Sequence, residues 1–223
     1  MNFQRVASPS SRSPTHLWLM LPGAYMKPAD FIEAGFVEAV HRRGLPHDIA
    51  LLDATIAEVA GGSALAFLQG YLRAVSADPS QRVCLLGISL GAQLALACLA
   101  GAGADPAQAQ AAARVDSACL MAPYLGPRDV VAEVATTGDL DGWTPAAIRP
   151  GDTEREIWRW LQHGCSSGPS LYLAYGSDDR FAAAHAFMGQ VLPANHVDIQ
   201  PGGHEWPVWS ALWNRHLDRF HAV

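Results

Sequence analysis

Short apolar runs alternate with longer segments of helical periodicity along most of this chain. Six strands are predicted from apolar runs at 16–23, 47–55, 81–89, 116–124, 170–176 and 196–203. Helices are predicted from apolar residues at helical spacing in 28–44, 62–80, 90–102, 181–193 and 206–220. Buried strands that alternate with helices are typical of a parallel sheet covered on both faces. We therefore expect an α/β fold with a doubly wound, mainly parallel six-stranded sheet.

The length of 223 residues suits one domain. Residues 1–15 are rich in Ser and Pro and are expected to form a loose N-terminal arm, while residues 16–223 form the α/β domain. The segment at about 125–169 separates the fourth and fifth predicted strands and is the expected lid-like insertion. Its three tryptophans either roof an acyl pocket or anchor the insertion to the body; they are Trp143, Trp158 and Trp160.

The charge balance and the cysteine spacing limit the classes of partner and of metal site that the chain can have. The chain has 15 basic and 21 acidic residues, a formal net charge of −6, and no long run of one sign. This balance argues against nucleic acid and anionic membranes as partners. No secretory leader or bilayer-spanning run is evident, so a cytoplasmic protein is expected, and a homo-oligomer stays open. The four cysteines lack zinc-site spacing and are expected to be reduced and structural.

The stretch "LLGISLG" marks the first candidate site residue. An apolar strand, Gly-x-Ser-x-Gly and a helix in succession predict a nucleophile elbow, a tight turn that presents Ser89 above the sheet. The turn leaves no room for side chains at its flanks, which explains Gly87 and Gly91. The backbone N–H of Leu90 would then face the reacting centre, where the helix dipole favours negative charge. The competing interpretation is an ordinary strand–helix turn with a small serine.

A serine nucleophile needs a histidine base and a carboxylate that orients it. His204 follows the last predicted strand in "PGGHEW", and its two glycines let the loop fold back towards Ser89. The carboxylate should follow the preceding strand, where Asp178 and Asp179 are adjacent. Asp53, after the second strand, is a distant competitor and is better explained as a turn residue.

Together these motifs resemble those of the α/β-hydrolases, in particular the small esterase and thioesterase type. "GISLG" (87–91), "YGSDD" (175–179) and "GGHEW" (202–206) occur in the order of that family, and the resemblance covers roughly 16–220. The segment "LPGAYM" stands where the family usually has an apolar strand that ends in His-Gly, with Pro22 in place of the His. The resemblance also implies a strand order of 47–55, 16–23, 81–89, 116–124, 170–176 and 196–203.

The resemblance further assigns roles around the predicted site. The family commonly places the acid three residues after the strand-ending glycine, which favours Asp179, and leaves Asp178 to cap the helix that begins near Phe181. The second oxyanion donor would be the N–H of Ala24, with Tyr25 as the alternative. Tyr25 and Met26 would line the pocket.

The predicted function is a serine hydrolase that cleaves a small to medium carboxylic ester or thioester through an acyl-enzyme. Ser89 would attack, His204 would accept its proton, and Asp179 would orient the imidazole. No nucleotide-binding or zinc-protease motif is present, so no metal or organic cofactor is implied. Two alternatives remain open: a peptidase, and a non-catalytic small-molecule binding protein on a hydrolase scaffold.

Overall fold

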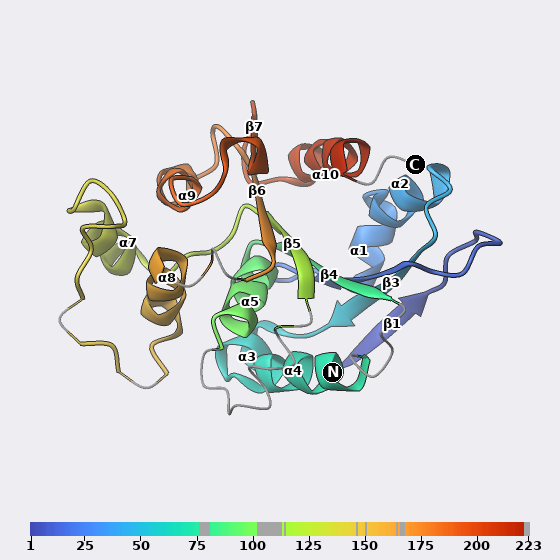
Figure 1. Cartoon of the computed structure of the whole chain (residues 1–223), viewed down its shortest axis with the longest axis horizontal. Helices are drawn as coiled ribbons and strands as arrows, with labels where there is room; N and C mark the ends of the chain where they lie inside the picture. The colour runs from blue at the N-terminus through green and yellow to red at the C-terminus, as the bar shows by residue number, and fades with distance from the viewer. Residues whose placement is uncertain are drawn as a thin grey trace.

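The computed structural model describes residues 1–75, 81–101, 113, 115–145, 147–149, 151–163, 165 and 168–220. A seven-stranded sheet crosses the molecule in the order β1-β3-β2-β4-β5-β6-β7 (Figure 1). Its strands are β1 (Asn2–Val6), β2 (His16–Leu21), β3 (His47–Asp53), β4 (Arg82–Ile88), β5 (Val115–Met121), β6 (Ser170–Gly176) and β7 (Val197–Gln200). All neighbours pair in parallel except β1, which is antiparallel to β3. The six predicted strands and their order are confirmed.

Helices cover both faces of this sheet (Figure 1). The described helices are α1 (Pro28–Glu33), α2 (Phe36–Arg42), α3 (Ile56–Ala60), α4 (Ser63–Val75), α5 (Leu90–Leu99), α7 (Arg128–Ala135), α8 (Thr153–His163), α9 (Ala182–Gly189) and α10 (Trp206–Phe220), and Ala194–His196 form a 3₁₀ turn. On one face α1, α2 and α10 pack together, and on the other α5 lies against β4 with α4 beside it. The expected single helix over 28–44 is two helices, because Gly35 interrupts it with a φ of 79°.

The expectation of a loose arm over residues 1–15 is wrong for its first part. Residues 2–6 form β1, which makes the sheet seven-stranded instead of six-stranded. The ring of Phe3 packs on Tyr71 at a centroid distance of 4.2 Å, which attaches this strand to α4. An edge strand pairs on one side and buries few side chains, so "NFQRV" carries no apolar run that would reveal it.

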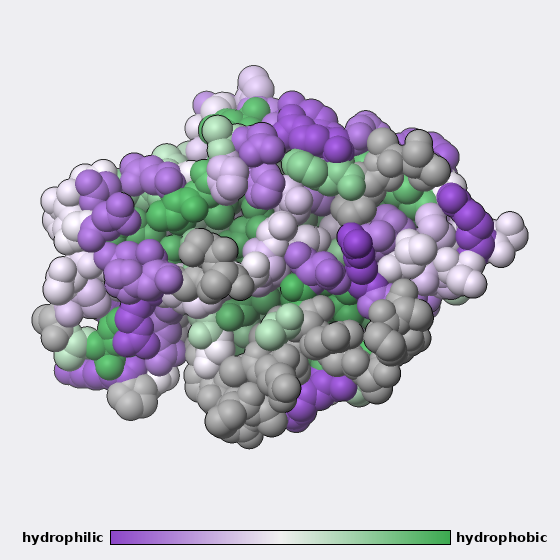
Figure 2. Space-filling model, viewed as in Figure 1, coloured by the Kyte–Doolittle hydropathy of each residue, from purple (hydrophilic) through white to green (hydrophobic). Residues whose placement is uncertain are grey.

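The core lies along the central strands and the helices beside them. Trp18 of β2 packs edge-to-face on Trp213 of α10 at 5.0 Å, and the Trp213 indole N–H donates to the Phe36 carbonyl at 3.0 Å. On the face seen in Figure 2, hydrophilic residues occupy much of the outline, while hydrophobic residues show mainly in its recessed centre and beside α9. No helix in the described ranges combines the length and apolar character needed to cross a membrane.

The four cysteines are free thiols, and three of them lie in the core. Burial raises the pKa of Cys84 and Cys98 to about 12 and also raises that of Cys119. These thiols stay protonated at neutral pH and are poor nucleophiles. The structural role predicted for them fits this environment.

Candidate active site

The predicted site residues lie beyond the carboxyl ends of neighbouring parallel strands. Ser89 follows β4, Asp179 follows β6 and His204 follows β7. Since β4, β5, β6 and β7 are consecutive in the sheet and parallel, these loops meet at one edge. That edge is where ligands bind in open α/β sheets.

Ser89 has the strained backbone expected of a nucleophile elbow. Its φ of 53° and ψ of −111° are rare for a residue with a side chain. A Cβ on Gly87 would lie 2.5 Å from the Ala92 backbone, and one on Gly91 would overlap the Leu21 carbonyl. Only glycine therefore fits on either side, which is the steric reason predicted from "GISLG".

The last residue of β5 and the loop after it form hydrogen bonds with both backbone groups of Ser89. The Ser89 N–H donates to the Met121 carbonyl at 2.8 Å, and the Ser89 carbonyl accepts from the Tyr124 N–H at 3.1 Å. Between these two partners, Ala122 has a positive φ of 47°. The conformation of Ser89 is thus supported from a neighbouring strand, and residues at this strand end were not predicted from sequence.

Asp179 and His204 form a close pair. Asp179 Oδ2 lies 2.7 Å from His204 Nδ1, and Asp179 Oδ1 accepts the Phe181 N–H at 2.8 Å. The Asp179 side chain is fully buried, which opposes ionisation, but the hydrogen bonds from His204 and Phe181 outweigh burial and lower the pKa of the carboxyl. An ionised carboxylate only accepts, so Nδ1 carries a proton, and in the neutral form of the ring Nε2 is then able to accept one.

The Asp178 side chain makes a different hydrogen bond from the one expected. Its carboxylate accepts the Gly202 N–H at 3.1 Å, and its own N–H donates to the Gly202 carbonyl at 3.0 Å. The expectation that it caps the helix near Phe181 is wrong, because the Asp179 carboxylate accepts that N–H. A Cβ on Gly176 would overlap the Gly202 carbonyl, so the loops after β6 and β7 need glycine to come this close.

Sequence reasoning missed two aromatic rings that contact the His204 ring and a third that contacts one of these two. The His204 ring lies 5.5 Å from Phe181 and 5.0 Å from Trp209, both edge-to-face, and Tyr124 lies 5.7 Å from Phe181. Trp209 is buried as well as in contact with His204. Among the described residues no hydrogen bond joins Ser89 Oγ to His204 Nε2, and such bonds are often long in unliganded sites.

The two predicted oxyanion donors have available N–H groups. Within the described part of the chain, neither the Leu90 N–H nor the Ala24 N–H donates to a backbone or side-chain acceptor. Leu90 is the first residue of α5, where orphan N–H groups and the helix dipole favour an anion. Tyr25 is 89% exposed with a φ of 63°, which is at odds with a pocket-lining role. Met26 is half-buried, and its Sδ accepts the Gly23 N–H at 3.1 Å.

Two further expectations concern groups away from the pair. Asp53, the competing acid, forms an ion pair with Lys27 at 3.2 Å. Trp143 and Trp158 are buried, and their indole N–H groups donate to Glu133 and to the Leu125 carbonyl. Of the two roles predicted for these tryptophans, the structure favours anchoring over an acyl roof.

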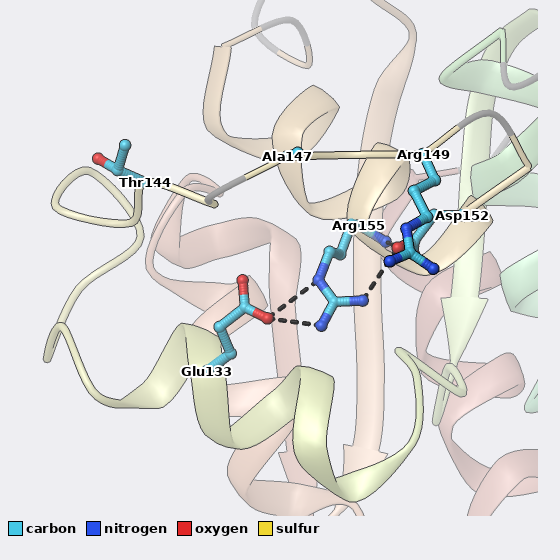
Figure 3. A pocket seen from close by; sticks show the side chains of 6 residues that line it. All are labelled: Glu133, Thr144, Ala147, Arg149, Asp152 and Arg155. Carbon is cyan, nitrogen blue, oxygen red and sulfur yellow. Dashed lines mark hydrogen bonds and ion pairs between the residues drawn. The ribbon is translucent and has the colours of Figure 1, made fainter.

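The insertion contains a surface cavity of about 490 Å³ around an ion-pair network. The Arg155 guanidinium lies between Glu133 of α7, at 2.6 Å, and Asp152, at 2.9 Å (Figure 3). This network ties the two helices of the insertion together. Among the described residues no group of three or more His, Cys, Asp and Glu side chains is arranged to hold a metal ion.

A second cavity, of about 310 Å³, lies beside the elbow. Its wall includes Leu90, which follows Ser89 in sequence, and Tyr124, whose N–H donates to the Ser89 carbonyl. The rest of the wall comes from α3, α4, α5, the start of α8, and the loop residues Gly62 and Gly151.

Similar solved structures exist, although no protein-family model and no curated protein sequence matches the chain. Fluorophosphonate-binding serine hydrolase F of Staphylococcus aureus aligns over 97% of this chain and 90% of its own, with a TM-score of 0.66 and 10% identity. The butyrate-bound esterase Est2 of Thermogutta terrifontis aligns over 98% of this chain and 87% of its own, with a TM-score of 0.65 and 14% identity. A monoacylglycerol lipase of Paleococcus ferrophilus aligns over 97% of both chains, with a TM-score of 0.59 and 12% identity. The chain thus has an α/β-hydrolase fold, the fold of these serine hydrolases and esterases.

Proposed function

We propose that this protein is a serine hydrolase that cleaves a carboxylic ester or thioester. The observation that carries the proposal is the buried Asp179–His204 pair, 2.7 Å apart, at the same sheet edge as the strained Ser89. The similar structures support it, since they include a serine hydrolase, an esterase and a lipase. Ordinary turn serines have no need of a positive φ, so the strain at Ser89 favours a functional role.

In the proposed reaction Ser89 Oγ attacks the acyl carbonyl as its proton passes to His204 Nε2. The C–O or C–S bond to the leaving group then breaks, and the imidazolium returns the proton to that leaving group. Water, deprotonated by the same nitrogen, attacks the acyl-enzyme and releases the acid. The net reaction is ester plus water giving acid plus alcohol, or the thiol for a thioester, and it needs no cofactor.

The surrounding groups supply orientation and charge stabilisation in this scheme. Asp179 fixes the His204 tautomer and stabilises the imidazolium that forms. The N–H groups of Leu90 and Ala24 stabilise the negative charge on the carbonyl oxygen, where loss of one donor typically costs 10²–10³-fold in kcat.

Labelling with a fluorophosphonate probe tests the proposal. We expect one adduct on the wild type, located by mass spectrometry at Ser89, and no adduct on Ser89→Ala. Turnover of p-nitrophenyl acetate should fall by about three orders of magnitude or more in Ser89→Ala, as for other triads. Ser11→Ala changes an exposed serine and serves as the matched control. A folded wild type that takes no label and turns over no ester would instead favour a binding protein.

A further inference from the structure

The cavity of about 310 Å³ beside Leu90 has a wall of two kinds. Its apolar part includes Leu65 of α4 and Leu94 and Ala97 of α5. Its polar part includes Gln93 and Glu154, joined by a hydrogen bond of 3.0 Å from the Gln93 amide to the Glu154 carboxylate. A cavity near the lower end of the usual ligand-pocket range suits a short or medium chain.

The position of this cavity relative to His204 indicates which half of an ester it takes. The leaving group must lie near His204 Nε2, because that nitrogen returns its proton. Phe181 and Trp209, the rings in contact with His204, are both absent from the described wall of the cavity. Leu90, whose N–H faces the carbonyl oxygen in the proposed reaction, belongs to it. The described wall, which does not include Ser89 or His204 themselves, therefore favours the acyl half of the ester over the leaving group as the occupant of the cavity.

The charges of the wall restrict the acyl chain further. Glu154 contributes a carboxylate, and none of the described residues that line the cavity is Lys, Arg or His. An anionic group on the acyl chain would lose water and meet a like charge without a cation to pair with. An uncharged chain meets the apolar wall of α4 and α5 and carries no such cost.

We propose that this cavity binds the acyl chain of the substrate, and that the chain is uncharged and short to medium in length, with Glu154 excluding anionic acyl groups. The inference rests on the proposed hydrolase function. It replaces one of the two roles predicted for the tryptophans, a roof over an acyl pocket, since Trp143 and Trp158 are buried within the insertion.

The first test varies the acyl chain with the alcohol held constant. We expect kcat/KM to rise at least tenfold from p-nitrophenyl acetate to butanoate to hexanoate, because each fully buried methylene contributes up to about fourfold, or about 0.8 kcal/mol. Values that are equal within twofold, or that fall with length, would overturn the acyl assignment.

A substitution in the wall links the trend to this cavity. Ala97→Leu adds a branched side chain to the wall and should lower the ratio of hexanoate to acetate kcat/KM at least fivefold. Ala211→Leu makes the same change at an exposed position of α10 and should leave that ratio unchanged. If Ala97→Leu also leaves it unchanged, the chain binds elsewhere and the inference fails.

The second test varies charge at constant carbon number. Wild-type kcat/KM for the mono-p-nitrophenyl ester of adipate should be at least tenfold below that for p-nitrophenyl hexanoate. Glu154→Gln keeps an acceptor for Gln93 and should narrow this gap at least threefold. Glu33→Gln removes an equal charge from an exposed site on α1 and should leave the gap unchanged. Equal narrowing by both variants would mean that net charge, and not Glu154, excludes the anion.

The outcomes for the inference and for the proposed function are separate. If ester turnover depends on Ser89 but does not vary with the length or charge of the acyl chain, the proposed hydrolase function stands and the cavity assignment is overturned. Turnover that survives Ser89→Ala overturns the hydrolase mechanism itself.

Discussion

Asp178 and Asp179 are adjacent in sequence but bond to different parts of the site. Asp179 contacts the His204 ring, whereas Asp178 contacts the backbone of the loop that carries His204. A shift of one residue along a turn reverses the direction of a side chain, so composition alone does not distinguish the two. The choice of Asp179 came from the resemblance to the α/β-hydrolases, which implies an acid three residues after the strand-ending glycine, here Gly176.

The two aspartates should respond differently to the same substitution. Asp179→Asn should lower kcat by about 10³–10⁴-fold, because an amide that donates to the ring holds the wrong tautomer. Asp178→Asn keeps an acceptor for Gly202 and should change kcat less than threefold. Its cost in the free energy of unfolding should be about 1 kcal/mol or less. Ester kinetics and urea unfolding of both variants check this, and an inactive Asp178→Asn beside an active Asp179→Asn would reverse the assignment.

At the level of strands and helices, predictability followed burial. Five of the six parallel strands have buried apolar runs, whereas the short β7 is only half-buried; sequence located all six. Edge strand β1 was missed, because its alternating and half-exposed side chains resemble those of a loop. The break at Gly35 was also missed, since the apolar spacing of 28–44 continues across it and only the backbone reverses.

The close approach of elements predicts opposite effects for two glycines. Gly91→Ala would drive a methyl group into the β2 backbone at Leu21, where neither element can move freely, and should destabilise the fold by roughly 2–3 kcal/mol. Gly70→Ala lies within α4, where the nearest heavy atom to a new Cβ is at 3.8 Å, and should stabilise it by about 0.5–1 kcal/mol. Thermal melts compare the pair, and equal shifts of the same sign would contradict the packing at the elbow.

At the scale of the whole molecule, buried His185 makes stability depend on pH. Burial lowers its pKa from the usual 6.5 to about 4, although a hydrogen bond to the Pro123 carbonyl at 2.9 Å and the nearby Asp179 charge act in the opposite direction. Between these values the unfolded chain binds more protons than the folded one. The stability due to neutral His185 is therefore complete above pH 6.5 and is lost as pH falls towards 4.

The size of this effect is measurable. From pH 7 to pH 5 the free energy of unfolding should fall by about 2 kcal/mol through His185 alone. His185→Gln can still donate to the Pro123 carbonyl but does not titrate, so its loss over the same interval should be smaller by about that amount. Urea unfolding at both pH values gives the comparison. An identical pH slope in both proteins would show that His185 is not held neutral by the fold.

Only those site residues that lie in a local sequence pattern could be predicted. Ser89 and His204 each follow a strand and stand beside glycines, so topology alone brings them to one edge. Phe181, Trp209 and Tyr124 come together from three separate segments, and no local pattern relates them. The cavity beside Leu90 depends on the packing of α8 against α5, which no strand or turn signal encodes.

The internal bonding of the insertion has a consequence for how such a protein can diversify. Its ion pairs through Arg155 and the indole bond of Trp143 to Glu133 join residues within 125–169, whereas Ser89 is fixed by Met121 and Tyr124, upstream of that segment. Changes in the length or composition of the insertion that keep the contact of α8 with α5 can therefore accumulate without displacing Ser89. The insertion can thus be exchanged as a unit. Replacing it should change the range of substrates and leave the arrangement around Ser89 unchanged.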